Sequence, residues 1–275
     1  MTDNHSQNQP KLNKIGFDNL LEDIFGLNIR ALKTIGIMFR KPVDYFKAAR
    51  TPEWEDKYTP SFRVWFGIMA ILVALNFIYN NDKSAMTAAY QGMVEQLATQ
   101  FEHDHNAANV KNGQPPDIID VDIDKAAIDM GKWAMVYYPF AYIPFMALAG
   151  IFVRFWGRSL TYVTRLRYLF AVTIPGVAFM FVSTFLVLVV SARYFLWLTA
   201  VMFLIIVALD FITSYRGPFR DMPRPKRLLR SAALTTILLL VYLFGSMAAT
   251  FPAMIKTVGD NITVNGEPLK RGNET

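Results

Sequence analysis

The most constraining feature of the sequence is an apolar run from Phe62 to Tyr79, in which Arg63 is the only charged residue. A helix needs about twenty apolar residues to cross roughly 30 Å of hydrocarbon. Comparable runs follow at 133–152, 169–190, 195–213 and 233–253. Because a helix satisfies its own backbone hydrogen bonds, runs of this length are typical of membrane-spanning helices. The sequence therefore predicts an all-α fold, a polytopic transmembrane helix bundle with five spans.

Composition agrees with a membrane protein. Hydrophobic residues make up 53% of the chain and charged residues 18%, whereas soluble domains carry about 25% charged residues. The formal charge of +6 gathers beside the spans. It therefore favours a lipid bilayer as the partner, and no nucleic-acid partner is expected. The absence of cysteine excludes disulfides and thiolate chemistry.

The region before the first span divides into two parts. Residues 1–16 are polar and predict a disordered tail without a secretion signal. Residues 17–61 predict cytoplasmic amphipathic or interfacial helices, because apolar residues recur there at helical spacing. The first positions of this apolar face are Leu20, Ile24 and Leu27. Prolines at 42, 52 and 60 favour the starts of short helices that lead to the first span.

Two external segments complete the organisation of a membrane domain over 62–253. In the connection 80–132, apolar positions from Met86 to Phe101 predict a second amphipathic helix. Residues 102–116 are expected to form a flexible connector, since they are polar and end in glycine and prolines. An extended segment then precedes a helix start, with Asp122 or Asp124 as N-cap. Residues 254–275 are expected to be an external C-terminal tail.

The distribution of basic residues predicts the orientation. Most of the 28 Lys and Arg residues lie before the first span, between the second and third, and between the fourth and fifth. The positive-inside rule places these three regions in the cytoplasm. We therefore expect a multi-pass protein of the bacterial inner (plasma) membrane, with the N-terminus cytoplasmic and the C-terminus external.

Two short motifs before the first span carry a family resemblance. The run 29–50 contains P-x-x-Y-F at 42–46, and the run 57–66 contains Y-x-P-x-x-R at 58–63. This region resembles an uncharacterised bacterial family of small multi-span membrane proteins, and its P-x-x-Y-F part is similar to the approach segment of Yip-type five-span proteins. Several members of the first family begin with a zinc ribbon of paired cysteines, which this chain lacks. The resemblance implies a membrane-embedded, non-enzymatic protein and supplies no catalytic residues.

Asp210 is the only acidic residue inside a predicted span. An ionisable residue in a membrane indicates a functional site, because its burial in hydrocarbon is costly. Asp210 lies about one turn from the cytoplasmic end of its span, where it could pair with Arg154, Arg158 or Arg216. We favour such an interfacial pair over a proton or ion site.

Metal binding is not expected. His103, Asp104 and His105 form an external cluster with suitable donor atoms, but their spacing fixes no third ligand, and a solvated segment is favoured. Acidic residues at 117, 120, 122 and 124 suggest a calcium loop, yet Lys125 and Gly131 stand where an EF-hand needs glycine and glutamate. Loose cation binding by these acids remains the alternative.

The basic stretch from 216 to 230 is a candidate site for anionic lipid headgroups. Basic residues near a membrane surface each contribute about 1 kcal/mol of attraction to anionic lipids. Such a stretch also fixes topology, and we weigh topology somewhat higher. The residues concerned are Arg216, Arg220, Arg224, Lys226, Arg227 and Arg230.

No catalytic motif supports an enzyme. The three histidines lie outside the predicted spans, and neither G-x-S-x-G nor H-E-x-x-H occurs. We therefore expect a non-catalytic protein without cofactors, which acts by binding lipid or a membrane-protein partner, including a second copy of itself. The small residues Gly245 and Ala249 would let another helix approach closely.

The alternative function is a small transporter or channel. It would use kinks at Pro144 and Pro175 and the few neutral polar residues within the spans, which are Asn76, Thr173, Ser183 and Thr184.

Overall fold

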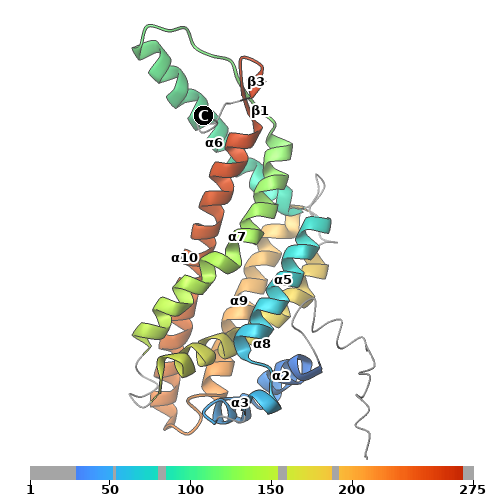
Figure 1. Ribbon diagram of the computed structural model, residues 1–275, viewed down its shortest axis with the longest axis vertical. Coiled ribbons are helices and arrows are strands. Elements are labelled where there is room, and N and C mark those ends of the chain that lie inside the picture. The colour runs from blue at the N-terminus through green and yellow to red at the C-terminus, as the bar shows by residue number, and fades with distance from the viewer. Residues whose placement is uncertain (1–28, 52–53, 80–84, 154–159, 188–191, 269–275) are drawn as a thin grey trace, which may run out of the picture.

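The fold is a helical bundle with extra elements at both ends (Figure 1). The computed structural model describes residues 29–51, 54–79, 85–153, 160–187 and 192–268. Leu20, Ile24 and Leu27 and the expected tail 1–16 therefore lie outside the described residues. The described helices and strands are α2 (Ile29–Arg40), α3 (Pro42–Ala48), α4 (Trp54–Lys57), α5 (Ser61–Tyr79), α6 (Ala85–Lys111), β1 (Ile119–Val121), α7 (Ile123–Phe152), α8 (Tyr162–Val187), α9 (Ala192–Arg216), α10 (Arg224–Asn261), β2 (Ile262–Val264) and β3 (Glu267–Pro268).

Five of these helices, α5, α7, α8, α9 and α10, are long and apolar enough to cross a membrane. The all-α bundle with five spans is thus confirmed, and the protein is a multi-pass membrane protein. The first span matches its expected bounds closely, whereas α7 and α10 extend well beyond the apolar runs that identified them. Figure 1 shows α7 changing direction along its length. Pro139 and Pro144 lie inside this helix, and an internal proline removes a backbone hydrogen bond.

The two extended helices support an assembly at the end of the bundle drawn uppermost in Figure 1. The helices α7 and α10 pack along much of their length, and α6 packs against the start of α7. Val94 of α6 is buried with Ala126, Ala127 and Met130 of α7. The apolar stripe of α6 therefore packs against the first turns of α7, which precede the predicted second span. Asp122 caps α7, since its Oδ1 accepts a 3.0 Å hydrogen bond from the Lys125 amide.

Two expectations about this assembly were wrong. The expected connector 102–116 is helical as far as Lys111, and the expected tail after 253 continues α10 to Asn261 and then forms β2 and β3. The three strands make an antiparallel sheet in the order β1-β2-β3, in which Ile119 pairs with Val264 and Val121 with Ile262. The pairing joins the segment before α7 to the segment after α10, a long-range contact that local sequence patterns do not show.

At the opposite end, the short helices before the first span pack beneath the bundle (Figure 1). Ala31 and Met38 of α2 are buried, whereas Leu32 and Phe39 are exposed. Thr34 joins α2 to the chain before α5, because its Oγ1 accepts a 3.0 Å hydrogen bond from the buried Thr59 amide. The hydrophobic core runs without interruption from these helices into the bundle.

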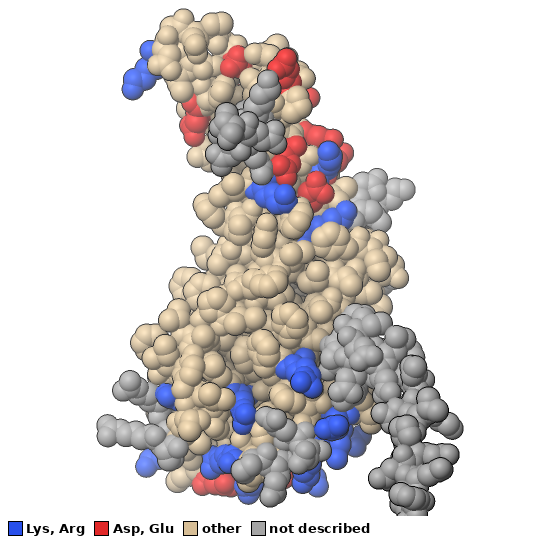
Figure 2. Space-filling view, viewed as in Figure 1, with Lys and Arg blue, Asp and Glu red and all other residues tan. Residues whose placement is uncertain are grey.

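The charged residues separate between the two ends. Figure 2 shows Lys and Arg gathered over the end that carries α2 and α3, and most of the visible Asp and Glu over the end that carries α6 and the sheet. We call these the basic end and the acidic end. Between them the visible surface is almost free of charge (Figure 2), as expected for a surface in contact with hydrocarbon.

Candidate functional site

The P-x-x-Y-F motif at 42–46 and the Y-x-P-x-x-R motif at 58–63 both contribute residues to an aromatic cluster at the basic end. Tyr45 lies within 5.8 Å of Trp54 and 5.5 Å of Tyr58, measured between ring centroids. Phe46 meets Tyr168 of α8 edge to face at 4.8 Å. Buried aromatic pairs of this kind contribute about 1 kcal/mol each beyond the area they bury. The motif residues therefore hold the short helices on the bundle, which is a structural role.

Hydrogen bonds reinforce this docking. The Tyr168 hydroxyl donates to the Phe46 carbonyl at 2.7 Å and accepts from Arg50 Nε at 2.7 Å. Burial within the cluster raises the pKa of the Tyr45 hydroxyl, so this side chain stays neutral.

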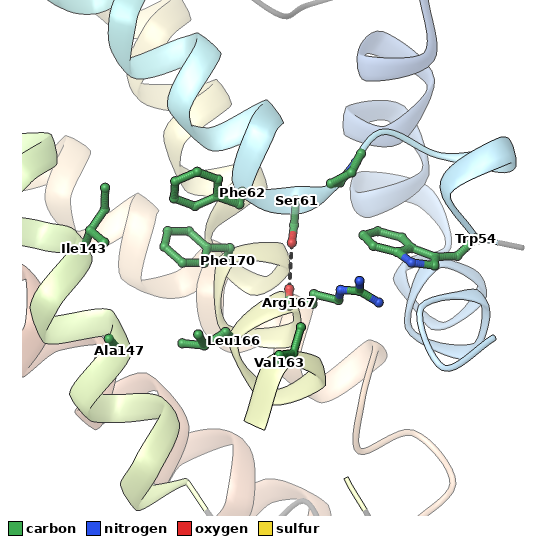
Figure 3. A pocket seen from close by; sticks show the side chains of 10 residues that line it. Trp54, Ser61, Phe62, Ile143, Ala147, Val163, Leu166, Arg167 and Phe170 are labelled. Carbon is green, nitrogen blue, oxygen red and sulfur yellow. Dashed lines mark hydrogen bonds between the residues drawn. The ribbon is translucent and has the colours of Figure 1, made fainter. Parts of the chain in front are cut away.

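A groove of about 280 Å³ opens beside the aromatic cluster (Figure 3). Its walls come from α4, α5, α7 and α8 and are almost entirely apolar. Arg167 places its guanidinium 4.5 Å from the centre of the Trp54 ring, and Ser61 Oγ donates to the Arg167 carbonyl at 2.8 Å. Phe62 and Phe170 meet edge to face at 5.1 Å. The groove suits an apolar chain, and its only hydroxyl is already engaged in a hydrogen bond.

A second cavity at the basic end, of about 560 Å³, is strongly polar and is called the basic pocket here. It lies where the end of α2 and the start of α3 meet the turn between α9 and α10. Five basic side chains and one acidic side chain line it. The lining residues are Arg40, Lys41, Pro42, Val43, Asp44, Tyr215, Arg216, Arg220 and Arg227.

Two arginines of the basic pocket are held in place by neutral acceptors. Arg216 donates to the Phe39 carbonyl at 3.4 Å and to the Arg40 carbonyl at 2.8 Å, at the C-terminus of α2. Arg227 donates to the Arg220 carbonyl at 3.2 Å and to the Tyr215 hydroxyl at 2.9 Å. Its guanidinium also lies 4.1 Å from the centre of the Tyr215 ring. Neutral acceptors orient these guanidinium groups without cancelling their charge.

One nitrogen of an arginine that lines the basic pocket has no acceptor. The Nε atom of Arg227 is buried, and no hydrogen bond joins it to any part of the chain that the structure describes. A buried donor without a partner costs about 1–3 kcal/mol. Because this atom has almost no accessible surface, the pocket offers an anion the charge of Arg227 rather than this donor.

The basic residues expected from sequence are divided by the structure. Arg216, Arg220 and Arg227 line the basic pocket, whereas Arg224, Lys226 and Arg230 do not. Sequence reasoning missed Arg40 and Lys41 as members of the same pocket. They lie more than 170 residues from Arg216 in the chain, and only the docking of α2 brings them together. The only feature of the sequence that pointed to Arg40 and Lys41 was their position at the end of a predicted helix.

Asp210 does not form the expected pair with Arg216, whose guanidinium is bonded to α2 instead. Arg154 and Arg158 lie outside the described residues. The Asp210 side chain is fully buried, and its Oδ2 accepts a 2.7 Å hydrogen bond from the Tyr242 hydroxyl of α10. Its Oδ1 accepts no hydrogen bond from the described chain and lies beside Gly176 of α8. Asp210 is therefore a buried acid in the interior of the bundle.

Tyr242, the hydrogen-bond partner of this acid, belongs to a stack of aromatic rings. Tyr142 stacks on Trp65 at 4.8 Å and on Tyr242 at 5.7 Å between ring centroids. Tyr138 stacks on Tyr142 at 5.6 Å. Tyr142 is fully buried in the bundle core. Gly245 packs directly against Tyr142, so the small residues of α10 serve an internal contact with α7.

Three of the four neutral polar residues considered for a transport route bond to their own helices. Thr173 Oγ1 donates to the Phe170 carbonyl, and both Ser183 and Thr184 donate to the Met180 carbonyl. Ser and Thr side chains commonly satisfy themselves in this way inside helices. These bonds support helix structure, and no polar path follows from them.

The histidine and aspartate residues of the acidic end form a structural junction. Asp117 Oδ2 accepts from His105 Nε2 at 2.9 Å and from Asn109 at 2.8 Å, and Asp117 Oδ1 accepts from Asn265 at 2.8 Å. These hydrogen bonds lower the pKa of Asp117. His103 instead lies 3.3 Å from the neighbouring Asp104, and both side chains are exposed. In the described segments, no group of three His, Cys, Asp or Glu side chains is placed to hold a metal ion.

The fold and the site define a class, a multi-pass membrane protein with a basic pocket at one end and a buried acid in the bundle. No protein-family model matches the sequence, and neither a curated protein nor a solved structure matches it.

Proposed function

We propose that the protein acts by binding an anionic phospholipid headgroup in the basic pocket. The observation that carries this proposal is the convergence of five basic side chains on one cavity, two of them held in place by neutral acceptors. Arginine presents donors in a rigid fork that suits phosphate oxygens. The single acidic side chain lining the cavity, Asp44, leaves a strong excess of positive charge.

The position of the basic pocket favours a lipid over a soluble anion. Arg216 is the last residue of the span α9, so the pocket lies where that span leaves the hydrocarbon. Basic pockets between membrane helices at this level commonly bind lipid headgroups. The exposed apolar residues Leu228 and Leu229, early in α10, offer a surface along which the acyl chains can lie.

The proposal includes the orientation of the chain. The concentration of Lys and Arg at the basic end supports a cytoplasmic position for that end in a bacterial inner membrane. The acidic end and the C-terminus are then external. A C-terminal reporter enzyme that is active only in the cytoplasm should therefore be inactive, and an active one would contradict this orientation.

Lipid retention by matched variants tests the proposal. Purified protein carrying Arg227→Gln should retain anionic phospholipid about tenfold less strongly than the wild type in native mass spectrometry. A charge-assisted hydrogen bond contributes about 1.5–3 kcal/mol, and about 1.4 kcal/mol corresponds to tenfold in affinity. Lys226→Gln is the control, because it removes the same charge from an exposed neighbour that does not line the pocket.

Two results would reject the proposal. One is equal loss of anionic lipid in both variants, which would mean that only net charge matters. The other is displacement of the lipid by millimolar inorganic phosphate, which would identify a soluble anion as the occupant. Zwitterionic lipid should be retained equally by all three proteins.

A further inference from the structure

A cavity of about 500 Å³ lies within the bundle and belongs to no part of the basic pocket. Its walls come from α5, α7, α8, α9 and α10. Two of its lining residues, Phe203 and Leu243, are 40% and 53% exposed on the surface of the spans. The cavity therefore reaches the lipid-facing surface, and a molecule dissolved in the hydrocarbon can enter it sideways.

Aromatic and methionine side chains dominate the walls of this intramembrane cavity. Trp65, Tyr138, Phe203 and Tyr242 line it, together with Met69 and Met180. The faces of aromatic rings carry partial negative charge and attract organic cations. Methionine side chains are flexible and polarizable, so they adapt to the shape of a bound molecule.

The buried acid lies directly behind this wall. Tyr242 lines the cavity, and its hydroxyl donates a 2.7 Å hydrogen bond to Asp210 Oδ2. Gly176 also lines the cavity, and a Cβ placed on it would lie 3.2 Å from Asp210 Oδ1. The glycine thus lets α9 bring the acid against the cavity wall.

Asp210 has no cationic partner among the side chains that the structure describes. The ion pairs found there join His103 to Asp104, His105 to Asp117 and Lys256 to Asp260. Burial without a charged partner favours the neutral acid. A cation in the cavity would stabilise the carboxylate, because charges attract strongly in a medium of low dielectric constant, and Asp210 would release its proton as the cation binds.

We propose that the intramembrane cavity binds an amphipathic organic cation, an alkyl-substituted ammonium or phosphonium compound, whose charge lies against the Tyr242 ring, with Asp210 behind that ring. The apolar part of the ligand fills the space between Met69, Met180 and Phe203. A neutral acyl chain would use the apolar walls but would gain nothing from the acid. Charge therefore distinguishes the proposed ligand from the surrounding lipid.

The comparison of a cation with its uncharged analogue tests this site without any mutation. The full-length protein in nanodiscs of zwitterionic lipid is titrated with radiolabelled dodecyltrimethylammonium, and empty nanodiscs give the background from partitioning. Saturable binding is expected. The analogue in which carbon replaces the nitrogen should displace the cation at least about tenfold less effectively. Binding that does not saturate, or equal displacement by the uncharged analogue, would overturn the proposal.

Variants then assign the charge recognition to Asp210. Asp210→Asn should weaken binding of the cation at least about tenfold, whereas Asp260→Asn, which changes a half-exposed acid of the acidic end, should leave it unchanged. If Asp210→Asn does not fold, Leu239→Trp serves instead, because it fills the cavity and leaves the acid in place. Unchanged affinity in a folded Asp210→Asn or Leu239→Trp protein would contradict the site.

Discussion

At the scale of single residues, close approaches between distant segments decide how the basic end is built. Gly217 follows the last residue of α9 and lies against the ring of Phe46, so that a Cβ at this position would clash with the ring. The same Cβ would lie 2.7 Å from the Thr213 carbonyl oxygen. This glycine therefore lets α3 pack against the turn that forms one side of the basic pocket.

Replacing this glycine gives a prediction with a built-in control. Gly217→Ala should lower the stability of the purified protein by about 1–3 kcal/mol, the usual cost of overpacking a tight site. Gly36→Ala should have the opposite sign, a gain of about 1 kcal/mol, because a Cβ there meets nothing within 4 Å and alanine favours the helix α2. Thermal unfolding in detergent measures both. Equal effects of the two variants would show that the contact with Phe46 is unimportant.

Sequence reasoning succeeded at this scale where the chemistry is local. Asp122 was one of two predicted caps, because a capping residue lies next to the helix that it starts. The environment of Asp210 was not predicted, since its partner Tyr242 lies 32 residues away on another helix. A single acid in an apolar run identifies a residue of interest, but its neighbours depend on how the helices pack.

At the scale of elements, polar contacts that hydropathy cannot show join the helix and strands of the acidic end. The apolar runs located all five spans, because hydrocarbon thickness sets their length. The helical course of 102–111 was missed, since its polar residues resemble a loop. Its stability depends on Asp117, Asn106 and Asn265, which fasten α6 to β1 and to the turn between β2 and β3. Composition does not reveal such a junction.

This junction should depend on pH. Hydrogen bonds from His105, Asn265 and Asn109 lower the pKa of Asp117 below its ordinary value of 3.8. Because the folded form binds its proton less readily than the unfolded form, the stabilisation is complete above about pH 4 and is lost as the pH falls through the lowered pKa. Hydrogen exchange should show that the β1 and β2 amides lose protection in that acidic range.

The matched variant for this prediction is Asp117→Asn, which keeps the shape of the side chain and removes its charge. Its sheet should already be less protected at neutral pH and should change little on acidification. A wild-type protein whose sheet protection stays constant down to pH 2 would show that Asp117 does not hold the junction.

At the scale of the whole molecule, three different structural regions follow one another along the long axis of the bundle. The acidic end forms an assembly fastened by Asp117, the middle holds a buried acid beside an apolar cavity, and the basic end presents a charged pocket at the membrane edge. Hydropathy and charge in the sequence were sufficient to predict the spans and a candidate basic region. They could not predict that α2 completes the basic pocket, because that depends on contacts across more than 170 residues.

Photo-crosslinking in intact cells tests the central claim, that the basic pocket holds an anionic lipid. A diazirine-bearing aliphatic residue replaces Val43, which lines the pocket, and in a separate protein it replaces Leu204, which is exposed on the span α9 away from the pocket. The lipids attached after illumination are identified by mass spectrometry. The account predicts that adducts at position 43 are strongly enriched in anionic phospholipid relative to those at position 204. Identical lipid composition at the two positions, or no lipid adduct at position 43, would contradict it.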